Sequence, residues 1–168
     1  MTVSLFLGKE EVQMQKAQYG ILRFAKYKGP EISNIEAHNE RKKEKYASNP
    51  DIDNNRRNLN YHFIEPVGKY RAESNRLIEE YGCRTRKDSV RVVEVLITAT
   101  PEFFKGKKKS EIRAYFQTAL EFIEKYQDSE TILSAVVHMD EKTPHMHLSF
   151  VPITQDGRLC AKEILGNK

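Results

Sequence analysis

The residues with the most specific chemical potential are three histidines within ten positions of one another, His138, His145 and His147. They border a short connector between two apolar segments, 132–139 and 145–153, which predict an antiparallel hairpin. Side chains alternate between the faces of a strand, so His145 and His147 are expected on one face. Pairing of the strands would bring His138 to about 5 Å from one of them. The spacing therefore predicts a facial metal site made of three imidazoles.

Two other interpretations of the histidine cluster stay open at this point. The histidines could lie by chance on the surface of a hairpin, but a half-buried strand face gains nothing from adjacent imidazoles that lack a partner. They could also form a structural zinc site, although such sites are closed four-coordinate shells, often with thiolates, and no fourth ligand is evident. Three neutral ligands leave positions open, as catalysis requires.

The elements that must position this cluster alternate between strands and helices. Serine 33 and Glu36 have the spacing of a capping box, which predicts the start of the first helix. Strands joined both by helices and by a hairpin favour an α+β fold, in which helices flank a central antiparallel β-sheet, over a doubly wound parallel sheet. The predicted strands are 19–25, 59–64, 89–98, 132–139 and 145–153, and the predicted helices are 34–45, 70–81, 113–126 and 161–165.

Composition limits the classes of protein that this chain can represent. Its 168 residues are 39% hydrophobic and 31% charged, enough for one domain with one core. No apolar run approaches the roughly 20 residues of a membrane span, and the N-terminus does not resemble a secretory signal. Residues 1–16 lack a sustained hydrophobic periodicity, and they are expected to form a flexible extension of a single domain, 17–168. The two cysteines, Cys83 and Cys160, have no metal or redox spacing, which favours a reducing cytoplasm.

The histidine cluster resembles the HxDExxPHxH signature of the V-type mobilisation relaxases, a branch of the HUH endonucleases. The match to that signature is complete. Upstream, residues 37–41 (AHNER) resemble the first motif of the family and residues 58–61 (NLNY) resemble the second. Residues 83–88 and 97–99 also resemble the family's sequence at the corresponding places, so the resemblance covers about residues 17–165.

The resemblance implies a relaxase-like sandwich and a metal-dependent enzyme of conjugative mobilisation and plasmid recombination. Such enzymes nick one DNA strand at a transfer origin, stay attached to its 5′ end and later rejoin the strand. It implies that His138, His145 and His147 hold a divalent cation, Mn²⁺ or Mg²⁺. An all-imidazole shell suits Mn²⁺ better, because Mg²⁺ prefers oxygen ligands. Relaxosome or coupling proteins are further expected partners, and no membrane segment is expected.

The resemblance also implies candidates for the residues that act on the phosphate. The histidine of the first motif, His38, is the favoured nucleophile, with Tyr46 and Tyr61 as alternatives. Arg41, Lys42 and Lys45, three, four and seven residues further on, are expected over the same helical face as His38. These cations would disfavour its protonated form and keep it nucleophilic near pH 7. Glu141 is expected to be either the general base for His38 or a partner that orients a ligand imidazole.

DNA contacts are expected from basic and polar segments on either side of the site. A net charge of +4 is compatible with this function but indicates it only weakly. Two other functions stay open. The chain could be a non-catalytic, DNA-binding remnant of a relaxase, because relaxases of this family are generally longer. It could also be a three-histidine hydrolase of small molecules, but that function would leave the basic segments unexplained. The predicted DNA contacts are Arg41, Lys42, Lys45, Arg57, Asn60, Tyr61, Arg84, Arg86 and Lys87.

Overall fold

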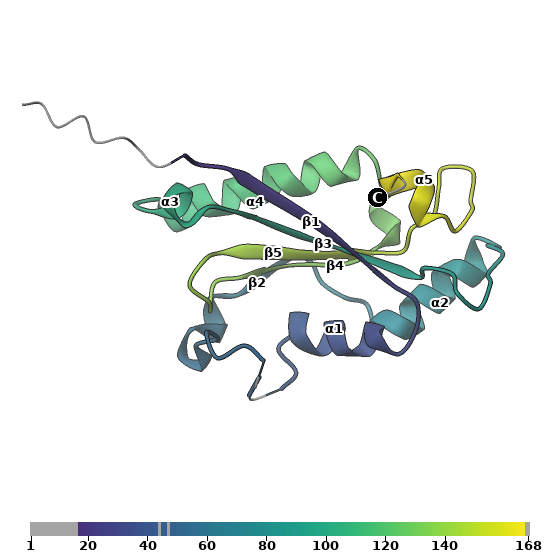
Figure 1. The fold of residues 1–168 in the computed structure, drawn as a ribbon, viewed down its shortest axis with the longest axis horizontal. Helices are drawn as coiled ribbons and strands as arrows, with labels where there is room; N and C mark the ends of the chain where they lie inside the picture. The colour runs from purple at the N-terminus through teal and green to yellow at the C-terminus, as the bar shows by residue number, and fades with distance from the viewer. Residues whose placement is uncertain (1–16, 44, 47, 167–168) are drawn as a thin grey trace, which may run out of the picture.

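The computed structural model describes residues 17–43, 45–46 and 48–166 (Figure 1). The predicted extension, 1–16, lies outside the described residues. Two short 3₁₀ turns, Asn54–Leu59 and Ser129–Thr131, precede strands. The strands are β1 Gly20–Tyr27, β2 Tyr61–Ile64, β3 Val92–Ala99, β4 Ile132–His138 and β5 His145–Phe150, and the helices are α1 Glu31–Asn39, α2 Tyr70–Glu80, α3 Pro101–Phe104, α4 Lys109–Glu124 and α5 Ala161–Leu165.

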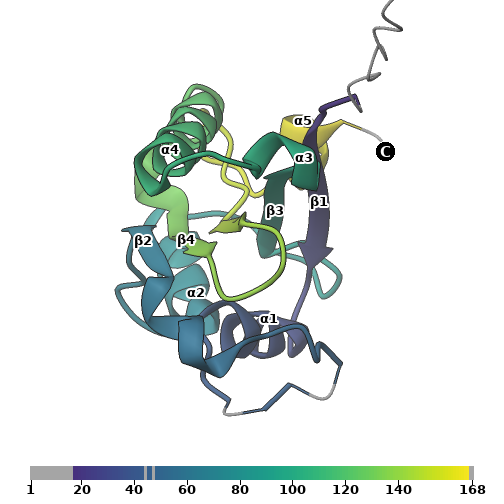
Figure 2. The same ribbon diagram turned by 90° about the vertical axis from the view of Figure 1, so that its left-hand side faces the viewer.

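The five strands form one sheet in the order β1-β3-β5-β4-β2, and every neighbouring pair is antiparallel. Helix α4 covers one face of the sheet, with α3 and α5 beside it, while α1 and α2 cover the other face (Figures 1 and 2). The predicted α+β fold, with helices flanking a central antiparallel sheet, is confirmed. The β4–β5 hairpin lies at the middle of the sheet, where neither of its strands is an edge.

Successive side chains of the central strands point to opposite faces of the sheet. One face is apolar, and the other carries the candidate site residues. On β3, Val93, Val95 and Ile97 pack into the core under α4. That core also buries the 3–4-spaced stripe of α4, where each large apolar side chain contributes roughly 1.5–3 kcal/mol of stability. The intervening residue Glu94 points to the opposite face, toward α1. The same alternation places Met146 in the core and His147 on the α1 side.

The first helix is shorter than predicted, and the prediction of a helix over 34–45 is wrong. Helix α1 begins after Pro30, whose φ of −58° already suits a helix start, so Ser33 lies within the first turn and caps nothing. The helix ends at Asn39, because Arg41 adopts a left-handed φ of 50°. Arg41, Lys42 and Lys45 therefore do not share a helical face.

Smaller differences concern element ends. The predicted strand over 59–64 begins only at Tyr61, because the preceding residues form a 3₁₀ turn, in which the side chain of Asp53 caps the backbone amide of Asn55. The four-residue helix α3, with Pro101 at its first position, was not predicted. Gly82 follows α2 with a φ of 64°, as expected for a helix C-terminus closed by glycine.

Candidate metal centre and nucleophile

The β4–β5 hairpin brings the three clustered histidines together. His138 pairs directly with His145 across the two strands, and His147 lies two residues further along β5. The ring centroids are 5.2 Å apart for His138 and His145, 4.8 Å for His138 and His147, and 5.0 Å for His145 and His147. The predicted convergence of the rings is thus present, and their role as metal ligands stays a prediction.

Each of these imidazoles is held in place through one of its two nitrogens. His138 Nε2 donates to the carbonyl of Asn39 at 2.7 Å, and His145 Nδ1 donates to the carbonyl of Thr143 at 2.9 Å. His147 Nδ1 donates to Glu94 Oε1 at 3.3 Å. Because these acceptors require a proton on the facing nitrogen, the other nitrogen of each neutral ring carries a lone pair. The lone pairs are those of His138 Nδ1, His145 Nε2 and His147 Nε2.

These lone pairs fit a bound cation. His138 Nδ1 and His147 Nε2 are buried and have no hydrogen-bond partner among the described residues. His145 Nε2 lies 3.0 Å from Glu141 Oε2, and two acceptors at that distance need a proton or a metal ion between them. Buried polar atoms without partners are costly, so native structures rarely leave them in that state. A divalent cation would satisfy all of them at once.

Burial also keeps the ligand candidates in the form that binds metals. It lowers the pKa of His138 to about 4. Burial lowers the pKa of His147 as well, and outweighs the opposite effect of the Glu94 carboxylate. Metal ligation requires neutral imidazole, so neither ring needs to lose a proton at neutral pH before a cation binds.

Candidate ligand atoms lie within 4.8 Å of one another in two overlapping groups. One contains His38, His138 and His147, and the other contains His138, Glu141 and His145. The predicted set of three histidines is therefore divided between two groups that share His138. The geometry adds Glu141 as a candidate ligand and makes ligation an alternative role for His38.

His38 lies in the last turn of α1, directly over the cluster. Its ring centroid is 5.3 Å from that of His147 and 6.0 Å from that of His138. Burial lowers the pKa of His38 most, and the guanidinium of Arg41 lowers it further. This lowering of the pKa agrees with the prediction that His38 is a neutral nucleophile. The cause differs from the prediction, because burial comes first and Lys42 is instead paired with Glu36.

Arg41 links the end of α1 to the hairpin connector. Its Nε and Nη2 donate to the two carboxylate oxygens of Asp140, both at 2.9 Å, and Nη2 also donates to Glu141 at 2.7 Å. Its Nη1 donates to the carbonyl of His38 at 3.0 Å. The side chain is only 7% exposed, and its predicted contact with DNA stays a prediction. Its four hydrogen bonds are already made within the protein.

Glu141 sits at the centre of this arrangement. It accepts hydrogen bonds from Arg41 and Asn49, the latter at 2.6 Å, and its Oε2 lies 3.0 Å from His145 Nε2. Burial raises the pKa of its carboxyl, but the nearby imidazoles of His138 and His145 outweigh burial and lower the pKa overall. A strongly held carboxylate of low pKa is a poor proton acceptor. The geometry thus favours the predicted orienting role over the general-base role.

Two residues around the cluster were missed at the level of sequence. Glu94 orients His147 and also accepts from the side chain of Asn39 at 2.6 Å. The signal for Glu94 was its place as the only charged residue in the apolar segment VVEVLI, because a carboxylate in a buried strand needs a partner. Asn39, next to His38 in the first motif, positions His138 through its backbone carbonyl, which no side-chain pattern reveals.

Several predicted DNA contacts beside the site make contacts within the protein. The side chain of Asn60 accepts from the backbone of Met139 at 2.7 Å, and Arg57 donates to the carbonyl of Lys43 at 2.8 Å. Lys45 is exposed. A hollow of about 400 Å³ lies at this edge of the site; it is lined by Lys45, Tyr46, Asn49, Pro50, Ile52, Asn54 and Arg57.

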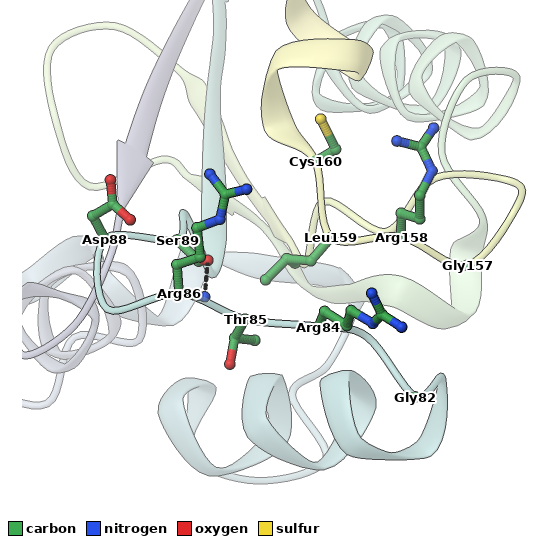
Figure 3. A pocket seen from close by; sticks show the side chains of 10 residues that line it. All are labelled: Gly82, Arg84, Thr85, Arg86, Asp88, Ser89, Gly157, Arg158, Leu159 and Cys160. Atoms are coloured by element: carbon green, nitrogen blue, oxygen red, sulfur yellow. Dashed lines mark hydrogen bonds between the residues drawn. The ribbon is translucent and has the colours of Figure 1, made fainter.

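The second predicted basic group lies far from the histidines. Arg84, Arg86 and Lys87 are exposed in the loop before β3, and this end of β3 pairs with Phe150, whereas its other end pairs with Met146 beside the cluster. Figure 3 shows Arg84 and Arg86 at a cleft of about 800 Å³. The length of the sheet therefore separates this group from the histidines, and its predicted contact with DNA stays a prediction.

A buried carboxylate secures the end of α1 that carries His38. Glu40 accepts from the hydroxyl groups of Tyr70 and Ser134 and pairs with His62 Nε2 at 2.6 Å. We expect Glu40→Ala to lower the free energy of unfolding by about 3 kcal/mol, because it leaves these buried partners unsatisfied. Urea denaturation measures the change. Glu80→Ala, which removes an exposed ion pair, is the control and should cost under about 0.5 kcal/mol.

The fold and the histidine cluster together define a relaxase-like α+β domain. Residues 16–168 match the family described as plasmid recombination enzyme, and the chain belongs to that family. It is 41% identical over 155 residues to a plasmid recombination enzyme type 1 of Staphylococcus aureus, covering 89% of this chain and 38% of that protein. A plasmid recombination enzyme of Lactiplantibacillus plantarum is 36% identical, with 42% of its length covered. The chain thus spans well under half of these relatives.

Solved structures show the same similarity. A Mn-bound MobM relaxase domain in complex with plasmid pMV158 oriT DNA superposes with a TM-score of 0.81 and is 32% identical, covering 88% of this chain and 76% of that one. Within the described part of the chain, every helix is too short or too polar to cross a bilayer.

Proposed function

We propose that this chain is the DNA-nicking part of a plasmid mobilisation and recombination relaxase. It would cut one DNA strand at a transfer origin in a metal-dependent reaction and become attached to the 5′ end. The observation that carries the proposal is the pair of buried, unpartnered lone pairs on His138 and His147, directly beside the imidazole of His38. Membership of the family and similarity to a Mn-bound relaxase domain on oriT DNA support it.

The residues that would hold the cation are His138, His145 and His147, with Glu141 as a further oxygen ligand or an orienting partner. Imidazole nitrogens suit Mn²⁺ better than Mg²⁺. When bound, the cation supplies positive charge that neutralises a non-bridging oxygen of the scissile phosphate. Glu94, Asn39 and Thr143 fix the orientation of the rings through their second nitrogens, as outer partners of ligand histidines do.

His38 is the nucleophile in this proposal. A ring nitrogen of its neutral imidazole forms a bond to phosphorus, and the 3′ oxygen leaves with its bonding electrons and takes up a proton. The ring releases its own proton, which leaves a phosphoramidate. Attack of a 3′ hydroxyl on this linkage reverses the step and rejoins the strand. Arg41 keeps His38 at a set distance from the cluster by tying its backbone to Asp140.

The alternative nucleophiles are less well placed. The hydroxyl of Tyr46 donates to the carbonyl of Ala37 at 2.6 Å and accepts from the backbone of Lys43, which leaves little of it free to attack. Tyr61 packs against the guanidinium of Arg113, and burial raises the pKa of its phenol, which opposes formation of the phenolate. Both facts support His38.

We further infer that the reaction takes place in the cytoplasm, where plasmid DNA is found. The two cysteines, Cys83 and Cys160, are both free thiols, which suits a reducing compartment. Relaxosome or coupling proteins are the expected partners of such an enzyme.

A nicking assay tests the proposal directly. Supercoiled plasmid carrying pMV158 oriT, the DNA bound by the similar MobM domain, is incubated with the chain in Mn²⁺ or in EDTA. We expect relaxed plasmid and a covalent protein–DNA adduct in Mn²⁺ only. Binding of this DNA without cleavage would overturn the proposal in favour of a non-catalytic remnant. Hydrolysis of a small phosphodiester without any DNA adduct would favour a three-histidine hydrolase instead.

Arg41→Lys tests the clamp on His38. Lysine cannot reproduce the paired hydrogen bonds to Asp140 and the bond to Glu141, so His38 and the connector lose their fixed spacing. We expect the single-turnover nicking rate to fall about 100-fold, since small misplacements of a reacting group have effects of that size. Arg76→Lys, on the exposed face of α2, is the matched control and should leave the rate unchanged. An unchanged rate in Arg41→Lys would contradict the positioning role.

A further inference from the structure

A strongly basic segment without a role so far lies between α3 and α4. Residues 105–113, KGKKKSEIR, carry four lysines and one arginine against a single carboxylate. Lys105, Lys108 and Lys109 are exposed, and no carboxylate of the described residues pairs with the ammonium group of Lys108 or Lys109. The one nearby acid of the helix, Glu111, is engaged by the backbone amide of Lys108 at 2.7 Å. The segment therefore carries an excess of positive charge at the surface.

This segment lies at the same end of the sheet as the histidine cluster. Lys109 and Arg113 line a hollow of about 240 Å³ together with Tyr61 and Met139. Met139 directly follows His138 in the chain, so the hollow begins one residue from a candidate ligand. Figure 2 looks onto this end of the molecule: the β4–β5 hairpin lies between α3 and the start of α4 on one side and α1 on the other.

Two cations of this segment, Lys107 and Arg113, are held in place by aromatic rings. The guanidinium of Arg113 lies 4.8 Å from the ring centroids of both Tyr61 and Phe63. The ammonium of Lys107 lies 4.5 Å from the ring of Phe103. Such contacts restrict long side chains before any ligand binds, which lowers the entropy lost on binding. Clustered like charges destabilise a folded chain, and a polyanion relieves that repulsion.

We propose that Lys105, Lys107, Lys108, Lys109 and Arg113, here named the lysine cluster, bind the phosphodiester backbone of the DNA that flanks the nick. The DNA would pass the hairpin end of the sheet, with the scissile phosphate beside His38 on the α1 side and the flanking phosphates on the α4 side. This inference rests on the proposed nicking function and extends it to a second contact surface. Lysines without base-reading partners position a backbone and carry no sequence preference.

Salt-dependent binding tests the lysine cluster. The variant Lys105→Ala, Lys108→Ala and Lys109→Ala is compared with the unaltered chain by fluorescence anisotropy, in EDTA so that no cleavage occurs. The probes are oligothymidylate of about 30 nucleotides, longer than the roughly 4–16 that one single-strand groove covers, and a duplex of the same length. Three lost phosphate contacts should reduce the slope of log K against log salt by about 2 for the single strand and slightly more for the duplex. Relative to 1 M salt, this change in slope corresponds to about 100-fold weaker binding of the variant at 0.1 M salt.

The control removes two positive charges at the other end of the fold. Lys125→Ala with Lys162→Ala, both exposed, should leave the slope nearly unchanged. A changed slope on either probe supports the proposal and identifies which form of DNA lies there. Slopes that match the unaltered chain on both probes would overturn it. A chain that shows the lysine-dependent slope but never nicks in Mn²⁺ would retain this inference and overturn only the nicking function.

Discussion

His38→Ala is expected to abolish both nicking and the covalent adduct, with a fall of about 10⁴-fold or more in rate, because the residue that bonds to phosphorus is gone. The decisive second measurement is Mn²⁺ affinity. His38 is close enough to His138 and His147 to share a cation with them, so loss of activity alone would not separate a nucleophile from a ligand. If His38 is the nucleophile, the affinity of the variant for Mn²⁺ should stay within about threefold, whereas losing a ligand costs far more.

The chemistry of the adduct provides an independent readout. A phosphoramidate on His38 hydrolyses in mild acid, whereas a phosphotyrosyl ester persists. An acid-stable adduct that forms in His38→Ala and disappears in Tyr46→Phe would move the nucleophile to Tyr46. Tyr46→Phe is otherwise the matched control, because it removes one hydroxyl bonded to the backbone and keeps the ring that packs 5.6 Å from the His38 ring.

Local patterns predicted the parts of the site that depend on neighbouring residues in the chain. The alternation around His145 and His147 and the short connector were enough to predict three converging imidazoles, because the pairing of a hairpin follows from its own sequence. The stripe of α4 and the apolar face of β3 were likewise predictable from their periods. These elements form the scaffold beneath the cluster.

The parts that could not be predicted depend on contacts between distant segments. Arg41 leaves the helical path because its guanidinium bonds to Asp140, 99 residues later, and no local propensity contains that information. The same contact gives Arg41 a positioning role that the sequence did not reveal. Glu94 is paired with His147, 53 residues away. The position of Arg84 and Arg86 depends on strand order, which brings the hairpin end and the loop before β3 to opposite ends of the sheet.

His147→Ala is expected to lower Mn²⁺ affinity by more than about 100-fold and to remove nicking with it, because one buried donor is lost from a small ligand set. Glu94→Gln keeps an oxygen that can accept from His147 Nδ1 but removes the negative charge that makes the ring a stronger ligand, so it should weaken Mn²⁺ binding by about 10-fold. Calorimetric titration of the metal-free chain with Mn²⁺ measures both, apart from any DNA chemistry.

The matched control for these variants is His62→Ala, which removes a histidine that pairs with Glu40 outside the cluster. It should lower stability but leave Mn²⁺ affinity within about twofold, since His62 belongs to neither group of candidate ligand atoms. Equal losses of affinity in His62→Ala and His147→Ala would mean that the effect comes from general destabilisation. Full Mn²⁺ affinity in His147→Ala would leave only His138, His145 and Glu141 as ligands, and the rings on β5 would then have different functions.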